Sequence, residues 1–321
     1  MGMERKNFLD RKILYELDLN CRRSNAQIAR SIKASKDIVN YHIKNLERMK
    51  IIEGYRTIID MSKLGFFTFR VYLKFQDTHR EIETGMIEAL KKRKEVWWLG
   101  KLSGRFDLVF AFWTKSHREF YEFWVKLLQK YRKYIHHEQI STFIEYIHYR
   151  RAYLINLPRD ETKTEIIGGG EETAYDETDW KILSLLAKNA RAPLLEIAKH
   201  IGLTPMAVKY RIKNLRKEGI IKGYRTLINF SKLGYEYYKV DMYLEDISKL
   251  KLLEGFCCSH PNIVYIDRTI GASDIEFDLE VKNLGHFIEI IEEIKAKFKG
   301  AIRNFEYFSV VKIYKTLYFL E

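Results

Sequence analysis

Residues 9–65 read LDRKILYELDLNCRRSNAQIARSIKASKDIVNYHIKNLERMKIIEGYRTIIDMSKLG, and residues 178–234 read TDWKILSLLAKNARAPLLEIAKHIGLTPMAVKYRIKNLRKEGIIKGYRTLINFSKLG. The two stretches align without a gap at a constant offset of 169, and 27 of the 57 aligned positions are identical. A repeat of this length indicates one folded unit that the chain uses twice.

The positive charge of the chain is concentrated in these two copies. The 321 residues carry a formal net charge of +13, and the copies alone contribute +5 and +9, so the remainder is nearly neutral. A basic excess confined to both copies of one small unit is the electrostatic footprint expected of a module that binds a polyanion.

Each copy has the pattern of three helices. In the first copy, Ser24 followed by Gln27 forms a capping box that opens a second helix. Ser35 caps a third helix with an apolar stripe, and Thr204 caps its equivalent in the second copy. Two short helices before a capped third helix predict a helix-turn-helix, whose third helix enters the major groove of DNA.

The face of the third helix opposite its apolar stripe supplies the candidate DNA contacts. After the helix, IIEGYRTIID and IIKGYRTLIN alternate around a glycine and predict a small hairpin or wing that carries one arginine in each copy. An alternative is that the basic side chains are a solvated helix face and that the two tyrosines pack internally. The candidate DNA-binding residues are Lys36, Asn40, Tyr41, Lys44, Arg56, Lys209, Tyr210, Arg211, Lys213 and Arg225.

After each copy the pattern changes to alternation, in the order β-α-β-β-α-β. The first half predicts strands near residues 69–75, 96–102, 107–114 and 140–154 and helices near 81–94 and 116–132. The second half repeats this order, with YYKVDMYL, NIVYIDRTI, DIEFDLEV and residues 304–319 as strands and residues 248–259 and 284–298 as helices. This order predicts a ferredoxin-like sheet with both helices on one face.

The other face of each sheet is expected to be apolar and to need a cover. We therefore predict that the two sheets pair back to back, within one chain or between two chains. The aromatic residues assigned to this face are Trp97, Trp98, Phe110, Phe112, Trp113, Tyr146, Tyr265, Phe277, Phe308 and Tyr314.

The predicted fold is α+β, with two winged helix-turn-helix units alternating with two ferredoxin-like domains. The segment between the halves contains Pro158 and three consecutive glycines and is predicted to be a linker. The predicted boundaries are residues 1–65 for the first winged unit, 66–155 for the first ferredoxin-like domain, 156–177 for the linker, 178–234 for the second winged unit and 235–321 for the second ferredoxin-like domain.

The chain resembles the Lrp/AsnC, or feast/famine, family of transcription regulators. The resemblance rests on LDRKIL and TDWKIL, VxYxIKNL, II-x-GYRT and SKLG, and it covers nearly the whole chain. It implies RAM-type ferredoxin-like domains that dimerise, so one duplicated chain would imitate a dimer. The family carries an Arg before the buried Ile of the third helix, which is Arg211 in the second copy and His42 in the first.

The resemblance also implies a small-molecule effector such as an amino acid. In the family, a Gly-x-x-Asp loop between the second and third strands helps to bind it. The matching residues are Gly104 and Asp107 in the first half and Gly271 and Asp274 in the second. Gly and Asp are also ordinary hairpin residues, and this structural interpretation is the favoured one.

Sequence-specific binding of double-stranded DNA and transcription regulation is therefore the predicted function, without catalytic residues. One alternative is a tetrapyrrole enzyme similar to the siroheme decarboxylases, with His117 and His148 as candidate ligands. Another is a protein that recruits the transcription machinery. The operator, the effector and the sign of regulation are not predictable from the sequence.

The three cysteines lack the spacing of a metal site, and no other metal or cofactor motif is present in the sequence. The chain has no apolar stretch of the roughly 18 residues that span a bilayer. We therefore expect a cytoplasmic protein without cofactor or metal.

Overall fold

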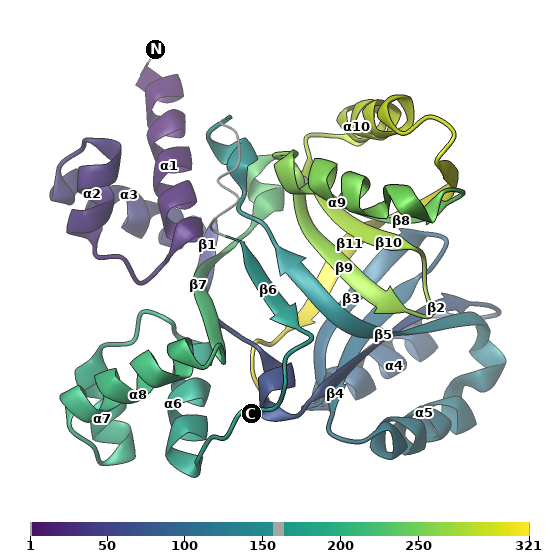
Figure 1. The fold of residues 1–321 in the computed structure, drawn as a ribbon, viewed down its shortest axis with the longest axis horizontal. Coiled ribbons are helices and arrows are strands. Elements are labelled where there is room, and N and C mark those ends of the chain that lie inside the picture. Colours follow the sequence, from purple (N-terminus) through teal and green to yellow (C-terminus); the bar gives the residue numbers. More distant parts are fainter. Residues whose placement is uncertain (1, 157–163, 321) are drawn as a thin grey trace.

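The computed structural model describes the backbone of residues 2–156 and 164–320, and the side chains within these ranges from residue 8 onward. The α+β prediction is confirmed: two helix-turn-helix units lie on one side of the molecule, and two ferredoxin-like halves form the other (Figure 1). No helix in the described ranges is both long and apolar enough to cross a bilayer. Part of the predicted linker, including Pro158, lies outside the described residues.

The three-helix prediction is confirmed in both copies. The helices are α1 (Gly2–Leu19), α2 (Asn25–Ile32) and α3 (Lys36–Arg48), and then α6 (Glu177–Lys188), α7 (Leu194–Ile201) and α8 (Pro205–Lys217). Ser24 forms the predicted capping box with Gln27, while the hydroxyls of Ser35 and Thr204 accept hydrogen bonds from the first turns of α3 and α8.

The predicted hairpin after each third helix is wrong. Each GYRT segment forms one strand, β1 (Ile52–Ile59) or β7 (Ile221–Ile228), and the two strands pair antiparallel with each other across the repeats. In this register Arg56 stands opposite Arg225, its own equivalent at the offset of 169. The pseudo-twofold axis that relates the two copies therefore passes through the middle of the β1–β7 ribbon.

The two β-α-β-β-α-β halves are also confirmed. The first contains β2 (Phe67–Phe75), α4 (Arg80–Lys92), β3 (Val96–Gly104), β4 (Leu108–Thr114), α5 (His117–Tyr131) and β5 (Ile135–His148). The second contains β8 (Glu236–Leu244), α9 (Leu250–Ser259), β9 (Ile263–Ile270), β10 (Ile275–Val281), α10 (Leu284–Lys297) and β11 (Ile302–Thr316). Short 3-10 turns span Met61–Leu64, Arg132–Tyr134, Ala152–Leu154, Phe230–Leu233 and Ile247–Lys249.

The halves join at their edges rather than only back to back. Strand β3 pairs with β11, β5 pairs with β9, and β2 pairs with both β4 and β5, so that eight strands close into a ring. Helices α4 and α5 cover the outside of the first half, and α9 and α10 cover the outside of the second (Figure 1). The inner faces of the two sheets therefore look toward each other, as predicted for pairing within one chain.

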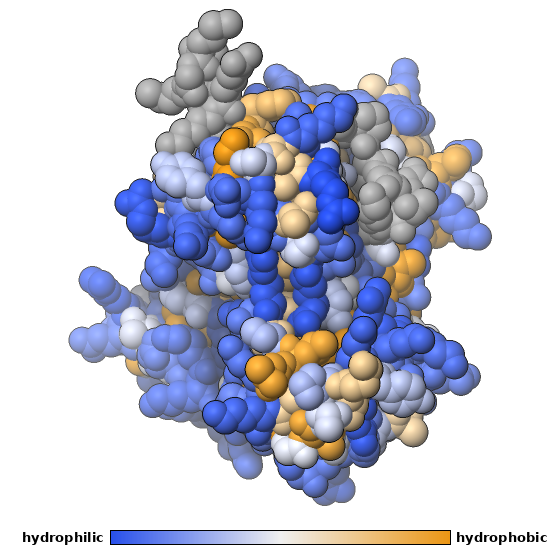
Figure 2. Space-filling view, turned by 90° about the vertical axis from the view of Figure 1, so that its left-hand side faces the viewer, coloured by the Kyte–Doolittle hydropathy of each residue, from blue (hydrophilic) through white to orange (hydrophobic). Residues whose placement is uncertain are grey.

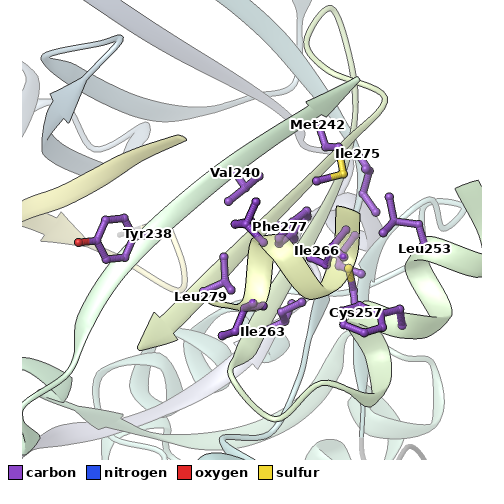
Figure 3. Close-up of a cluster of buried hydrophobic side chains, with 14 of the residues drawn as sticks. Tyr238, Val240, Met242, Leu253, Cys257, Ile263, Ile266, Ile275, Phe277 and Leu279 are labelled. Carbon is purple, nitrogen blue, oxygen red and sulfur yellow. The ribbon is translucent and has the colours of Figure 1, made fainter. Parts of the chain in front are cut away.

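The assignment of the aromatic residues to faces is partly wrong. Phe110 and Phe112 pack against α4 and α5, and Phe277 packs with Val240, Leu279 and the helices α9 and α10 (Figure 3). Because the side chains of a strand alternate, these residues point away from the interior of the ring.

The interior of the ring carries buried charges instead of a purely apolar cover. Along β8 and β10, every second side chain is apolar and packs against the helices α9 and α10. The side chains between them point into the ring, and the buried charged ones are Lys239, Asp241, Glu276, Asp278 and Glu280. Arg70 of β2 reaches across from the first sheet and binds Glu276 and Asp267, with 2.6 Å between Nη1 and Oδ2 of Asp267. Buried charges require such partners, since desolvation of an isolated ion is costly.

The predicted linker contains a short strand, although its sequence shows no alternation of apolar and polar residues. Strand β6 (Glu165–Gly168) adds to β5, and the carboxylate of Glu165 is buried against Arg150. The five predicted segments are thus interwoven in space, since the ribbon and the ring both contain strands from the two halves.

Loss of Arg70 is expected to destabilise the fold strongly. Arg70→Met leaves Glu276 buried without its cation and Asp267 with the more distant Lys239 alone, at 3.6 Å, which costs about 3–5 kcal/mol of unfolding free energy. Arg105→Met, which breaks a half-exposed pair with Glu306, should cost less than about 1 kcal/mol. Denaturant unfolding of the two variants measures the difference, and equal losses would contradict this account of the interior.

Candidate nucleic-acid interface and central cavity

The outer faces of α3 and α8 are exposed on the side of the molecule that carries both helix-turn-helix units (Figure 1). Figure 2 shows this side as predominantly hydrophilic, with small apolar areas near its upper and lower ends. Tyr41 and Tyr210 are 60% and 64% exposed, so neither tyrosine is packed in a core. The other predicted contacts that lie exposed on these helices are Lys36, Lys44, Lys209 and Lys213.

Two predicted contacts have partners within their own unit. The amide of Asn40 accepts a hydrogen bond from Asn25, and Arg211 pairs with Asp176 and Asp179 at 2.8 and 2.9 Å. The equivalent of Arg211 in the first copy, His42, lies 2.7 Å from Asp10, which is the equivalent of Asp179. This position therefore connects the third helix to the first in both copies, although the side chain of Arg211 stays 31% exposed.

The placement of Arg56 and Arg225 on a wing is also wrong. Arg225 is only 4% exposed, donates to the carbonyl of Tyr149 at 2.5 Å and lies 3.3 Å from a carboxylate oxygen of Glu165. Arg56 is half-buried and donates to the carbonyl of Lys188. Both side chains form hydrogen bonds within the protein, because the strands that carry them pair with each other instead of forming two separate wings.

Symmetric contacts fix the two helix-turn-helix units to one another. The N–H of Cys21 donates to the carbonyl of Tyr224 at 3.1 Å. The N–H of Ala190 donates to the carbonyl of Tyr55 at 3.0 Å. At the offset of 169, Cys21 is equivalent to Ala190 and Tyr55 is equivalent to Tyr224. The β1–β7 ribbon therefore determines the relative orientation of the two third helices.

The predicted effector residues are occupied by internal hydrogen bonds. Asp107 accepts from the N–H of Phe75 at 2.8 Å, and Asp274 accepts from the N–H of Leu244 at 2.7 Å. Gly104 and Gly271 have φ values of +127° and +96° in the same turns. The two carboxylates thus hold the ends of β2 and β8, which supports the structural interpretation of this motif.

A cavity of about 490 Å³ lies between the inner faces of the sheets and the β1–β7 ribbon. A β-bulge between Val96 and Trp98 turns both Trp97 and Trp98 toward it. Further residues that line it are Arg70, Phe143, Tyr146, His148, Arg151, Arg225, Tyr237, Lys239, Tyr265, Asp267, Asp278, Glu280 and Tyr318. Sequence reasoning missed this site, although the alternation in β8 and β10 contained the signal.

Most charges of the cavity wall are paired. Arg151 binds Glu280 through two hydrogen bonds of 2.8 and 2.9 Å and Asp18 at 3.0 Å. Lys239 lies 2.6 Å from a carboxylate oxygen of Asp278. The three arginines that surround Asp18 lower its pKa even though burial acts in the opposite direction.

Of the two candidate histidines, only His148 lines the cavity. His117 is exposed at the start of α5, against Phe67 on the outside of the first sheet. His148 is 5% exposed, and burial together with Arg225, Arg150 and Arg151 holds its pKa well below the usual value. The imidazole is therefore neutral at pH 7. Within the described side chains, no cluster of His, Cys, Asp or Glu has the arrangement of a metal site.

The family model described as winged helix-turn-helix DNA-binding matches residues 9–53 and 175–222. The chain is 30% identical over 123 residues to the HTH-type transcriptional regulator FL11 of Pyrococcus furiosus, which covers 37% of this chain and 82% of that protein. It is 52% identical over 60 residues to the HTH-type transcriptional regulator LrpA of Pyrococcus horikoshii, which covers 19% of this chain and 43% of that protein.

Among solved structures, the siroheme decarboxylase NirDL has a similar fold over most of its length. The TM-score is 0.63 at 12% identity, and the match covers 97% of this chain and 92% of that chain. NirDL has also been solved in complex with an iron-uroporphyrin III analogue. At this identity the likeness concerns the fold alone, including its tandem arrangement.

His148 is expected to make folding sensitive to mild acid. The unfolded chain gains a proton at this residue near pH 6.5, whereas the folded chain does not because burial keeps the pKa low. Stability that is present above about pH 6.5 is therefore lost as the pH falls, by up to about 1.4 kcal/mol per pH unit. His148→Gln should flatten denaturant unfolding free energies between about pH 5.5 and 7.5, while the exposed His117→Gln should leave the slope unchanged.

Proposed function

We propose that this chain, which belongs to the Lrp/AsnC family of DNA-binding transcription regulators, binds one duplex with both of its helix-turn-helix units at once. The observation that carries the proposal is the presence of exposed basic and aromatic side chains at equivalent positions of α3 and α8, in units fixed to each other by symmetric contacts. One chain then acts as the counterpart of a dimer.

The proposed contacts are the exposed lysines and tyrosines of the two helices. Lysines bind phosphates and release counterions, and a tyrosine at the same face donates to the backbone or packs on a sugar. Because its side chain is buried, Arg225 is not part of this set. Arg56 and Arg211 are left out because each side chain already has partners in its own molecule. The set is Lys36, Tyr41, Lys44, Lys209, Tyr210 and Lys213, with Asn40 at its edge.

The two half-sites are expected to be related but not identical. The pseudo-twofold axis through the ribbon favours two related major-groove contacts, separated by one helical turn of about 10–10.5 base pairs or by a multiple of it. The reading faces differ where Asp37 and Asn40 of α3 correspond to Met206 and Lys209 of α8. An operator that departs from a palindrome fits this pair of surfaces.

A second candidate is tetrapyrrole chemistry in the central cavity. It is favoured by the fold shared with a siroheme decarboxylase and by a neutral, buried His148 in an aromatic cavity. The wall charges do not single out a ligand with many carboxylates such as a uroporphyrin, since Asp267, Asp278 and Glu280 line the same space as the basic residues with which they are paired. Regulation of transcription is therefore the better-supported function. Binding of a tetrapyrrole in the cavity is tested below.

Recruitment of the transcription machinery and modulation by an amino acid remain family expectations. In the described residues of the family's effector loop, Asp107 and Asp274 each accept a backbone N–H, and Asp107 also binds the ammonium group of Lys74 at 3.0 Å.

Removal of one lysine from either third helix should weaken DNA binding to a similar extent. Lys44 and Lys213 are equivalent, so Lys44→Ala and Lys213→Ala should each reduce the slope of log affinity against log salt by about 0.9 for each lost phosphate contact. DNA fragments selected from a genomic library and then footprinted supply the operator for the measurement. Lys126→Ala, on the exposed face of α5, is the control. A loss in only one of the two variants would refute joint binding by both units.

The second candidate has a spectroscopic test. If it holds, addition of iron uroporphyrin III to the purified protein should produce a shifted Soret band that His148→Ala changes and His117→Ala does not. The absence of a shift in the unmodified protein would eliminate tetrapyrrole chemistry and leave the DNA-binding proposal untouched.

A further inference from the structure

The outward stripe of each third helix consists of four residues. In α3 they occupy positions 37, 41, 44 and 48, each about one helical turn from the next and opposite the buried side of the helix. Their equivalents in α8 occupy positions 206, 210, 213 and 217. All eight side chains are exposed. In a helix-turn-helix this is the face that enters the major groove, so these residues are placed to determine which bases each unit prefers.

The two stripes differ in character at their first position. The second position is tyrosine, the third is lysine and the fourth is basic in both units, whereas the first is Asp37 in α3 and Met206 in α8. The differences at positions 38 and 40 lie on the flanks of the helix, and the amide of Asn40 is held by Asn25. The first position is also nearest the N-terminus of the helix, where a recognition helix meets base edges. It is therefore the best placed to make the two half-sites different.

Met206 is a large apolar side chain at the surface, 71% exposed in the first turn of α8. Leu195 and Leu203 of the same unit are 70% and 36% exposed, and both are alanine in the first unit. The second unit thus presents apolar surface around the N-terminal end of its third helix. The apolar group that the major groove offers to such a surface is the C5-methyl group of thymine.

Asp37 offers the opposite chemistry at the equivalent place. Its carboxylate is exposed in the first turn of α3, where it also stabilises the positive end of the helix dipole. Phosphates repel a carboxylate, so this residue suits a DNA surface where it faces a hydrogen-bond donor of a base. The donor that carboxylates recognise in the major groove is the N4 amino group of cytosine.

We propose that the first residue of each stripe selects a base of its half-site: Met206 packs against a thymine methyl group, and Asp37 accepts a hydrogen bond from the amino group of a cytosine. This inference rests on the proposed function and adds to it the base chemistry of each half-site. Because the two units prefer different bases, the chain binds its operator in one orientation, whereas the two orientations of a symmetric dimer are the same.

Replacement of thymine by uracil tests the methyl contact, because it removes the C5-methyl group and leaves base pairing unchanged. Each thymine of the operator obtained by genomic selection and footprinting is replaced singly. In one half-site, a replacement should weaken binding by about threefold to fourfold, as expected for one buried methyl group. Met206→Ala should bind the thymine and uracil operators equally. Met49→Ala, which shortens an exposed methionine outside the stripe, is the control and should retain the full difference.

Exchange of the two residues tests the base preference. Asp37→Met gives both units a methionine, so the chain should prefer an operator with two copies of the second unit's half-site over the natural operator by about fivefold or more. Met206→Asp should give the reverse preference, for two copies of the other half-site. Each preference is a ratio of two affinities of one variant at one salt concentration, so a general effect of charge cancels. Arg48→Lys makes the fourth position identical in both units and should leave the ratio within about twofold.

Circular dichroism confirms that each variant is folded, and the uracil series on the unmodified protein does not depend on any variant. An operator affinity that ignores every uracil replacement, or a difference that survives in a folded Met206→Ala, would overturn the methyl contact. Unchanged ratios in both exchange variants would overturn the selection of bases. If the apolar surface of the second unit instead docks a protein, Met206→Ala leaves DNA affinity unchanged, which also overturns the inference. Any of these results with specific DNA binding contradicts this inference alone, whereas the absence of any selected fragment contradicts the proposed function as well.

Discussion

Unpaired strand edges are the constraint on which the rest of the structure depends. Each ferredoxin-like half ends in two edge strands, β3 and β5 in the first and β9 and β11 in the second, and each GYRT segment is a single strand without a local partner. Exposed edges leave backbone N–H and C=O groups unsatisfied, and they invite uncontrolled pairing. The two halves satisfy these groups for one another through β3–β11, β5–β9 and β1–β7.

This mutual pairing determines what the interior contains. Helices cover the outer face of each sheet, so the two inner faces lie toward each other. These inner faces carry arginine, lysine and carboxylate side chains in addition to aromatic rings. Paired charges of this kind add little net stability but are intolerant of mismatch. The ion pairs of Arg70 and Arg151 each connect different parts of the chain, so they specify how the halves meet.

The sequence predicted the elements well because their signals are local. Capping by Ser24, Ser35 and Thr204 and the period of each strand depend on residues a few positions apart. The partners of β1 and β7 were not predictable in this way, since an alternating stretch looks the same in a hairpin and in a ribbon between distant segments.

The candidate site was only partly predictable for a related reason. Exposure of Tyr41 and Tyr210 follows from helical periodicity, and the structure agrees. The pairing of Arg211 with Asp179 and the burial of Arg225 beside Glu165 depend on where other elements pack, and Glu165 lies in a segment without periodicity. The alternation of β8 and β10 predicts charged residues on the inner face, but the cavity also depends on a bulge in β3 that the sequence does not show and that turns Trp97 inward.

The covalent connection between the two copies has a consequence for how the protein responds to its own abundance. When two separate subunits must first associate, the amount of competent complex at low abundance rises with the square of subunit concentration. Here the partner of each unit is tethered to it, and its effective local concentration does not fall on dilution. Occupancy of a target would then rise in simple proportion to the number of molecules in the cell, so even scarce copies would act without waiting for a second molecule.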